Sequence, residues 1–297
     1  MEIKKVGVIG CGLMGHGIAQ VAAQGGCEVV VVEAVQTALD AGKARIEKSV
    51  AKLAEKAVEK GKISSEQAKA QAEGTLARLE GSLDRKSVAD CDLVIEAIVE
   101  NLEAKNELFA ELGKLCKPQT IFASNTSSFP IADMAAASGR PARMIGLHFF
   151  NPVQLMRLVE VVRTDATDPE VLAAARAFGE ACGKAPVTAK DTPGFVVNRL
   201  LVPYMTQALA MLERGDATAE DIDTAMKLGC GHPMGPIELT DYVGLDTTLY
   251  ILQGWVKRFP DEPAFAIPAV LERKVKEGKL GRKSGQGFYT WQGDKRA

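Results

Sequence analysis

The sequence of 297 residues has few of the features that mark membrane, nucleic-acid-binding or secreted proteins. Its formal net charge is only −2, so neither nucleic acid nor an anionic membrane surface is indicated as a partner. No apolar run approaches the ~20 residues that a membrane-spanning helix needs. A composition of 46% hydrophobic and 25% charged residues is that of a globular protein with one large domain or two of ordinary size.

Cysteine and histidine are scarce, and neither forms a metal-binding or disulfide pattern. No C-x-x-C pair occurs, cysteine and histidine do not cluster in a metal-like pattern, and the six cysteines are scattered at positions 11, 27, 91, 116, 182 and 230. We therefore expect free thiols in a reducing compartment and no bound metal. Met-Glu-Ile-Lys-Lys leads directly into a strand-like segment, so we expect no signal peptide and a cytoplasmic location.

Residues 5–33 read as strand, glycine-rich turn, helix and strand, which is the order of a dinucleotide-binding unit. In G-C-G-L-M-G, Gly10 permits the tight turn, Gly12 lets the backbone approach a pyrophosphate, and Gly15 lets helix and sheet pack closely. The helix N-terminus then offers N–H groups to the phosphates. Glu33 would accept both ribose hydroxyls and repel a 2′-phosphate, so NAD is favoured over NADP. A glycine turn that binds nothing is the alternative, and the surrounding pattern argues against it.

Residues 37–80 predict a helical hairpin that stands off the sheet. One apolar stripe follows the first helix, and a basic stripe lies beside it, with Ser49 and Lys56 on the flank near the seam. A basic stripe could hold the phosphates of a large anionic substrate. Nearby glutamates balance the charge, and spacing alone favours a solvated face. The apolar stripe is Ile46, Val50, Leu53 and Ala57, and the basic stripe is Lys48, Lys52, Lys56 and Lys60.

Strands predicted at 92–97 and 120–123 continue a doubly wound sheet, and the second is followed by S-N-T-S-S. Polar residues just past the carboxyl end of such a strand face the ligand crevice. We expect Ser127 to contact nicotinamide and substrate there. The alternative is that this segment only caps the next helix, with Ser128 as the N-cap.

Residues 144–162 read as strand, loop and strand, with His148 at the end of the first strand and Glu160 inside the second. On neighbouring strands the two side chains would meet. An imidazole titrates near neutral pH, and a carboxylate fixes its tautomer and stabilises its charged form, as proton transfer requires. The alternative is a core histidine beside a solvated glutamate.

The segment Asp191-Thr-Pro-Gly194 interrupts the pattern of helices and strands. It divides the sequence into two predicted domains, residues 1–190 and 191–297. The first is α/β, a Rossmann-type doubly wound sheet with the helical hairpin as an insertion. The second is an all-α C-terminal domain, because the later segments have a helical pattern, except for a tail at 281–289 that is too glycine-rich for a helix. Its first helix, predicted at 195–214, carries Asn198 in the first turn. An apolar face on this helix predicts a homodimer through the C-terminal helices, and the face consists of Leu200, Leu201, Met205 and Leu209.

The next helix has its own start and stop signals. Thr218 is a predicted N-cap with Asp221 three residues later, and Gly229 is the predicted stop.

The motifs resemble, in order and over essentially the whole chain, those of the short-chain L-3-hydroxyacyl-CoA dehydrogenases, including bacterial 3-hydroxybutyryl-CoA dehydrogenases. They are G-C-G-L-M-G, E-A-I-V-E-N, S-N-T-S-S, G-L-H-F-F-N-P-V, D-T-P-G-F-V-V-N-R, H-P-M-G-P and G-R-K-S-G-Q-G-F-Y. The resemblance implies an NAD-binding domain with a CoA-facing hairpin, followed by a dimerisation domain. It also implies the reversible NAD-dependent oxidation of (S)-3-hydroxyacyl-CoA to 3-oxoacyl-CoA, in fatty acid β-oxidation or butanoate metabolism.

Residue by residue, the resemblance implies that His148 is the catalytic histidine, Glu160 its carboxylate partner, and Asn198 a substrate contact together with Ser127. Some relatives carry Asp where this chain has Glu33, and the longer side chain keeps the acceptor. The implied CoA contacts are Ser49 and Lys56. The implied NAD contacts are Glu33, Glu100, Lys105, Ser127, Asn151 and Lys283.

Three alternatives remain open from the sequence. A dehydrogenase of the same architecture could act on a sugar acid such as gulonate, as in the λ-crystallin branch, although Ser49 and Lys56 argue against it. A non-catalytic protein could retain the cofactor pocket. A 6-phosphogluconate-type dehydrogenase would use a lysine base, for which Lys190 is the candidate, but His148 and Glu160 would then have no role.

Overall fold

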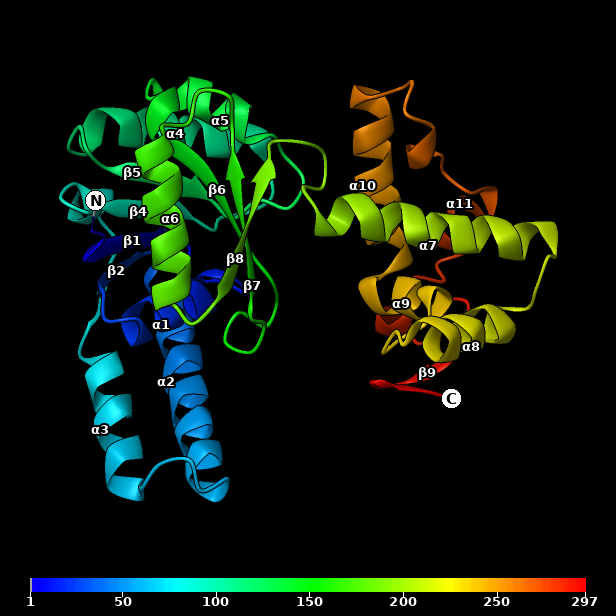
Figure 1. Ribbon diagram of the computed structural model, residues 1–297, viewed down its shortest axis with the longest axis horizontal. Helices are drawn as coiled ribbons and strands as arrows, with labels where there is room; N and C mark the ends of the chain where they lie inside the picture. The colour runs from blue at the N-terminus through cyan, green and yellow to red at the C-terminus, as the bar shows by residue number, and fades with distance from the viewer. Residues whose placement is uncertain (1) are drawn as a thin grey trace. The chain divides into compact units, whose positions relative to one another are not determined.

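The computed structural model describes residues 2–297 and divides them into two compact units. The first ends at Phe195, and the second is Val196–Ala297. Figure 1 shows the strands of the large sheet in the first unit and α7–α11 in the second.

The first unit is built on one eight-stranded sheet in the order β3-β2-β1-β4-β5-β6-β7-β8. Neighbouring strands are parallel except for β6 and β7, which are antiparallel. The predicted doubly wound sheet is confirmed, and its order reverses beside β1, where such sheets bind ligands. The strands are β1 (Lys5–Ile9), β2 (Glu28–Val32), β3 (Leu79–Ser82), β4 (Leu93–Glu96), β5 (Ile121–Ser124), β6 (Met144–Phe149), β7 (Leu158–Arg163) and β8 (Ala185–Lys190).

Edge strand β3 overlaps the end of the predicted hairpin, 37–80, so the helical prediction was wrong there. The segment Leu-Glu-Gly-Ser has neither an apolar run nor β-branched residues. Pairing with β2, rather than its own propensity, makes it a strand.

Helices cover both faces of the sheet, and the central strands are therefore apolar on both sides. In β2, Val29 and Val31 enter the core on one face, while Val30 and Val32 enter the core on the other. The first face is covered by α1 (Gly15–Gln24), α2 (Gln36–Glu59) and α6 (Pro169–Ala181), and the second by α4 (Leu102–Leu115) and α5 (Ile131–Ser138).

Helices α2 and α3 (Ser65–Leu76) form the predicted hairpin, whose free end extends beyond the sheet (Figure 1). Ile46 and Val50 are buried, as the apolar stripe predicts, and the four lysines of the basic stripe are exposed. A capping box fixes the start of α3, because Ser64 Oγ accepts the N–H of Gln67 and the Gln67 side chain accepts that of Ser64.

The second unit packs helices around a core that includes Leu209, Ile237 and Trp255. Thr218 caps α8 as predicted, but the helix passes the predicted stop at Gly229 and ends at Cys230, with Gly231 as its C-cap, whose φ of 69° suits glycine. The helices are α7 (Val197–Arg214), α8 (Ala219–Cys230), α9 (Pro236–Val243), α10 (Leu245–Arg258) and α11 (Ala269–Lys276). Short 3₁₀ helices lie at η1 (Arg85–Val88), η2 (Pro141–Arg143), η3 (Pro263–Phe265) and η4 (Arg282–Ser284).

The C-terminal tail adds a small antiparallel ribbon, β9 (Trp291–Gln292) and β10 (Lys295–Arg296), which the predicted all-α domain did not include. Buried Asp241 holds this tail: its carboxylate accepts the N–H groups of Phe288 and Tyr289 at 2.8 Å and the indole N–H of Trp291 at 2.9 Å. Burial nevertheless raises the pKa of Asp241 above its ordinary value.

No helix within residues 2–297 has the length and apolarity to cross a membrane. The same residues contain no cluster of His, Cys, Asp and Glu that could hold a metal ion. The six cysteines are free thiols, and all but Cys230 are buried. Burial raises the pKa of Cys91 to about 12, so this thiol stays protonated and unreactive at neutral pH.

Asp92 ties the start of β4 to β1 and to the segment that follows α4, and these contacts make stability depend on pH. Its carboxylate accepts the backbone N–H groups of Lys4 and Lys5 at 3.0 Å and the Lys117 ammonium at 2.7 Å. Burial alone would raise the pKa of Asp92, but these hydrogen bonds outweigh burial and lower the pKa below its ordinary 3.8. The stabilisation is therefore present above that value and is lost as the pH falls through the folded-state pKa.

We expect Asp92→Asn to lower Tm at neutral pH by about 2–4 °C, for a loss of about 1 kcal/mol. The gap between variant and wild type should close as the pH falls through the folded-state pKa, because protonation removes the same charge from the wild type. Thermal unfolding followed across pH measures this. Exposed Asp90→Asn is the control, and a gap for Asp92→Asn that persists in acid would contradict the assignment.

Candidate active site

The candidate site is centred on His148 and Glu160, which lie directly opposite each other on β6 and β7. The imidazole Nδ1 is 2.6 Å from Glu160 Oε2. Their exposed fractions are 4% and 0%, so Glu160 is not a solvated strand residue. The structure thus brings the two groups together as the strand–loop–strand pattern predicts, away from water, where a charged hydrogen bond is strong.

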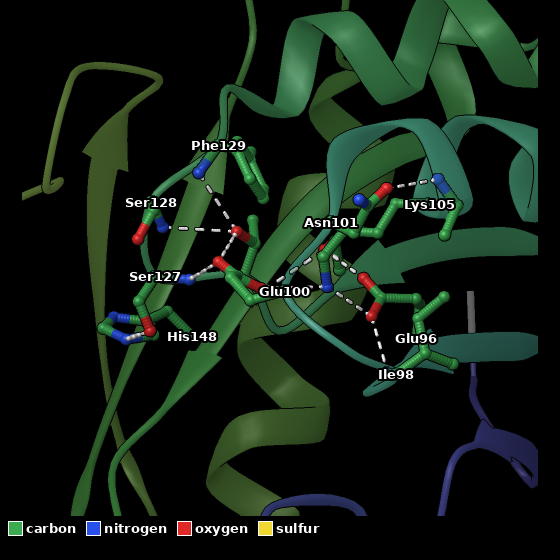
Figure 2. A network of polar contacts seen from close by, with 12 residues as sticks. Glu96, Ile98, Glu100, Asn101, Lys105, Ser127, Ser128, Phe129 and His148 are labelled. Carbon is green, nitrogen blue, oxygen red and sulfur yellow. Dashed lines mark hydrogen bonds and ion pairs between the residues drawn. The ribbon is translucent and has the colours of Figure 1, made fainter. Parts of the chain in front are cut away.

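The second imidazole nitrogen faces Ser127, in the loop after β5. His148 Nε2 lies 3.1 Å from Ser127 Oγ. Figure 2 draws this contact as a dashed line. Because Nδ1 faces a carboxylate, it carries the proton of the neutral ring and donates to Glu160. Nε2 can then accept a hydrogen bond from the Ser127 hydroxyl, or the proton of a substrate hydroxyl beside it.

Two aromatic rings pack against the imidazole. The ring centroids of Phe150 and Phe195 lie 4.5 Å and 5.5 Å from that of His148. Phe195 has a φ of 54°, a left-handed conformation that is strained for a bulky side chain. Strain of this kind, directly against the candidate catalytic ring, is common at functional sites. Sequence reasoning missed both rings, because apolar residues in F-F-N-P and P-G-F read as ordinary core.

The glycine-rich loop after β1 has the geometry of a phosphate-binding turn. Gly10 has a φ of 97°, and a Cβ there would lie 2.5 Å from the Ala97 carbonyl oxygen. A Cβ on Gly15 would lie 1.8 Å from the Gly10 carbonyl oxygen. At Gly12, in contrast, a Cβ would have no protein atom within 4 Å, so the space beside it is open. The loop therefore fits a pyrophosphate at Gly12 and the N-terminus of α1.

Glu33 follows β2 at the same edge of the sheet and faces this loop. Its Oε1 accepts the N–H of Cys11 at 2.6 Å, and its Oε2 accepts the N–H of Ala34 at 3.1 Å. The carboxylate is thereby fixed beside the glycine turn, where the adenosine ribose lies in dinucleotide-binding folds.

Glu100 and Lys105 belong to a network that reaches Ser127 (Figure 2). The Lys105 ammonium lies 2.6 Å from Glu96 Oε1 and 3.1 Å from Glu100 Oε2. Glu100 Oε1 in turn accepts the Thr126 hydroxyl at 2.5 Å and the Ser127 N–H at 3.2 Å. The two residues singled out from sequence therefore lie next to the Ser127 loop, with Lys105 only 1% exposed.

Sequence reasoning did not single out three residues that stabilise this site: Glu96, Asn125 and Lys184. Glu96 binds the Lys105 ammonium. Asn125 Oδ1 accepts the N–H of Phe149 at 2.9 Å, and Lys184 donates to the Met156 and Val153 carbonyls. Lys184 thereby holds the loop after β6, and its burial lowers its pKa. Asn125 could have been found, because it belongs to the S-N-T-S-S motif. Lys184 lies in no motif, so the local sequence gives no sign of its role.

The Ser128 capping alternative is wrong. Helix α5 begins at Ile131, with Pro130 in the N-cap position and no side-chain cap from Ser128. The N–H groups of Ile131 and Ala132 instead bind the Asp191 carboxylate at 3.0 Å and 2.9 Å. The serine-rich loop is therefore not needed to cap α5.

The remaining candidates lie at three other places. Asn151 is in the exposed loop after β6, at a cis peptide bond with Pro152, while half-buried Ser49 and exposed Lys56 lie on α2. Asn198 and Lys283 belong to the second unit. Asn198 is in the first turn of α7, and the Lys283 ammonium lies 2.6 Å from Asp246.

Known proteins match this chain over almost its full length. A family profile for 3-hydroxyacyl-CoA dehydrogenase, NAD binding domain, matches residues 5–192, and one for its C-terminal domain matches residues 194–291. The mitochondrial hydroxyacyl-coenzyme A dehydrogenase of Sus scrofa is 50% identical over 290 residues, 97% of this chain and 91% of that protein. The probable 3-hydroxybutyryl-CoA dehydrogenase of Deinococcus radiodurans is 49% identical over 287 residues, 97% of this chain and 100% of that protein.

A solved structure agrees in fold. The crystal structure of (S)-3-hydroxybutyryl-CoA dehydrogenase from Ralstonia eutropha matches with a TM-score of 0.91 at 39% identity. The match covers 98% of this chain and 100% of that chain.

Proposed function

This chain belongs to the 3-hydroxyacyl-CoA dehydrogenase family, an NAD-dependent family, and we propose that His148 and Glu160 carry the proton of its reaction. The reaction interconverts 3-hydroxyacyl-CoA and 3-oxoacyl-CoA. Among its substrates we favour the pair 3-hydroxybutyryl-CoA and acetoacetyl-CoA, since bacterial relatives of similar length are named for it. The observation that carries the proposal is the hydrogen-bonded line Glu160–His148–Ser127, in which His148 Nε2, facing Ser127, is the nitrogen that can accept a proton.

In the oxidation direction, His148 Nε2 takes the proton of the 3-hydroxyl group. Glu160 accepts the hydrogen bond from Nδ1 and stabilises the imidazolium as it forms. Bound NAD⁺ supplies the acceptor for the hydride that leaves C3. In the reduction direction, the imidazolium returns the proton to the 3-oxo oxygen. Ser127 and Asn198 are the proposed hydrogen-bond partners of the substrate oxygens, and such positioning lowers the barrier.

The proposed cofactor site lies at the carboxyl ends of the parallel strands, where the glycine-rich loop follows β1 and Glu33 follows β2. Gly10, Gly12 and Gly15 are proposed to receive the pyrophosphate, and Glu33 the ribose hydroxyls. The remaining proposed contacts with the cofactor are Glu100, Lys105, Ser127, Asn151 and Lys283.

The test of the function is NADH oxidation by the purified protein with acetoacetyl-CoA, compared with NAD⁺ reduction by gulonate. We expect turnover with the CoA ester and none with the sugar acid. Turnover with gulonate alone would replace the proposal by the sugar-acid alternative, and no turnover with either would support a non-catalytic protein. Longer 3-oxoacyl-CoA esters would then define the preferred chain length.

We propose that the hairpin binds the CoA part of the substrate through Ser49 and Lys56. Both lie on α2, and the exposed Lys56 ammonium belongs to the basic stripe. A stripe of ammonium groups suits the phosphates of CoA. The alternative is that the basic stripe is only a solvated helix face. Reversing the charge of one lysine distinguishes these two hypotheses.

We expect Lys56→Glu to raise KM for acetoacetyl-CoA roughly tenfold, because a charge-assisted hydrogen bond contributes about 1.5–3 kcal/mol. KM for the same acyl group on a short pantetheine, which lacks the nucleotide phosphates, should change little. The control is Lys69→Glu on α3, whose ammonium lies beside Glu73. Equal increases for both substrates would exclude the CoA role.

We propose a homodimer through the C-terminal helices. The predicted apolar face was partly wrong, because Met205 and Leu209 are buried in the core of the second unit and Leu201 packs against it. Leu200 on α7 is 69% exposed, and Met211 on the same helix and Val196 just before it are also exposed, a costly arrangement for a lone helix face. Light scattering should give twice the chain mass of 31.7 kDa, and a monomer mass would contradict the proposal. The cytoplasmic location stays a prediction.

A further inference from the structure

The proposed reaction leaves one fully buried charged residue at the site without a role. Glu96, the last residue of β4, is 0% exposed and lies beside the 1% exposed Lys105. Burying two charges costs several kcal/mol per ion, and a buried pair is weak support for stability, since apolar residues often serve as well. We therefore look for the role of the Glu96–Lys105 pair in fixing the geometry of the site rather than in stability.

The carboxylate of Glu96 joins three segments of the chain. Its Oε1 accepts the N–H of Ile98 at 2.8 Å and the Lys105 ammonium of α4 at 2.6 Å. Its Oε2 accepts the hydroxyl of Ser124 at 2.5 Å, and Ser124 is its direct neighbour on β5. The loop after β4, helix α4 and the end of β5 therefore meet at one carboxylate.

Two routes lead from Glu96 to the loop of Ser127. Through Lys105, it fixes Glu100, whose Oε1 accepts the Ser127 N–H. Through Ser124, it fixes the start of the loop, because Ser124 Oγ accepts the N–H of Thr126 at 3.2 Å. Figure 2 shows the first route from Glu96 and Lys105 past Glu100 to Ser127 and His148.

We propose that Glu96 is a positioning residue of the dehydrogenase: through Lys105 and Ser124, it fixes Ser127 against His148 Nε2. The role rests on the proposed function, in which Ser127 and His148 hold the substrate oxygen. Glu96 itself is buried beneath the loop and need not touch the substrate. Its contribution is to orientation, where a displacement of about 1 Å can cost about 10²-fold in rate.

The informative variant is Glu96→Gln, which keeps the shape but removes the charge and one acceptor. Three donors then face a side chain with a single acceptor oxygen, so at least one contact is lost. We expect kcat with acetoacetyl-CoA and NADH to fall about 10- to 100-fold, with little change in KM for acetoacetyl-CoA. The matched control is Thr120→Val just before β5, at the end of the strand away from Ser124, which removes a buried hydrogen bond to the Cys91 carbonyl.

Both variants should lower Tm, but only Glu96→Gln should lower kcat. Should Glu96→Gln fail to fold, Ser124→Ala removes one route alone and should lower kcat less, again with little change in KM for acetoacetyl-CoA. An unchanged kcat in the folded variant, or equal losses of kcat in Glu96→Gln and Thr120→Val, would overturn the positioning role.

A readout without turnover separates this proposal from the proposed function. The chain has only 3 histidines, so the imidazole NMR signals are few, and His148→Gln assigns those of His148. We expect Glu96→Gln to shift the His148 signals and Thr120→Val to leave them in place. Absent wild-type turnover would overturn the function, whereas unshifted signals would overturn the positioning role by themselves.

Discussion

His148→Gln is expected to reduce kcat for acetoacetyl-CoA and NADH by roughly 10²–10⁴, the usual range for loss of a general acid–base group. Glutamine fills a similar volume and can hydrogen-bond to both Glu160 and Ser127, which lie 2.6 Å and 3.1 Å from the two ring nitrogens. The amide of glutamine, however, cannot take the proton of the 3-hydroxyl group and cannot give one to the 3-oxo oxygen. Steady-state kinetics measures the loss, and fluorescence titration should show NADH binding nearly unchanged.

The control for this variant is His232→Gln in the second unit, where the imidazole contacts the Tyr204 hydroxyl at 3.0 Å. That change removes a histidine with no part in the proposed chemistry and should leave kcat near that of the wild type. Turnover of His148→Gln within about twofold of wild type would end the assignment of His148 as the proton carrier.

The second large effect is expected for Glu160→Gln, which removes the negative charge of Glu160 and keeps an oxygen that accepts a hydrogen bond. The amide oxygen can still accept the Nδ1–H of His148, so the tautomer and ring orientation are retained. The imidazolium, however, loses a charged hydrogen bond that contributes about 1.5–3 kcal/mol. Since 1.36 kcal/mol is a tenfold change in rate, kcat should fall about 10- to 100-fold.

Steady-state rates with acetoacetyl-CoA and NADH measure this effect as well. Glu80→Gln makes the same substitution at an exposed position of strand β3 and serves as the control. If Glu160→Gln retained full activity, the carboxylate would be structural only.

The central pair was accessible to sequence reasoning because its geometry is local. His148 and Glu160 lie on consecutive strands joined by one loop, and an antiparallel pairing places them opposite each other. The glycine turn was accessible for the same reason: its spacing, its position after β1 and the acid at the end of β2 form one unit.

Contacts between distant segments were not accessible. Local sequence made Ser128 a plausible cap, but the carboxylate that binds the start of α5 comes from Asp191, in a different part of the chain. Lys105 reads as one more surface lysine of an amphipathic helix, and only the fold shows that Glu96 and Glu100 enclose its ammonium. Motif resemblance named Lys105 and Glu100 but gave no reason to single out Glu96.

A double-mutant cycle tests most directly whether His148 and Glu160 act as one proton-transfer unit. The rate of hydride transfer in a single turnover is measured for His148→Gln, Glu160→Gln and the variant that carries both. A carboxylate cannot support an imidazolium that is absent, so the double variant should be no slower than His148→Gln. A loss equal to the product of the two single losses would show that the residues act independently and would contradict the account.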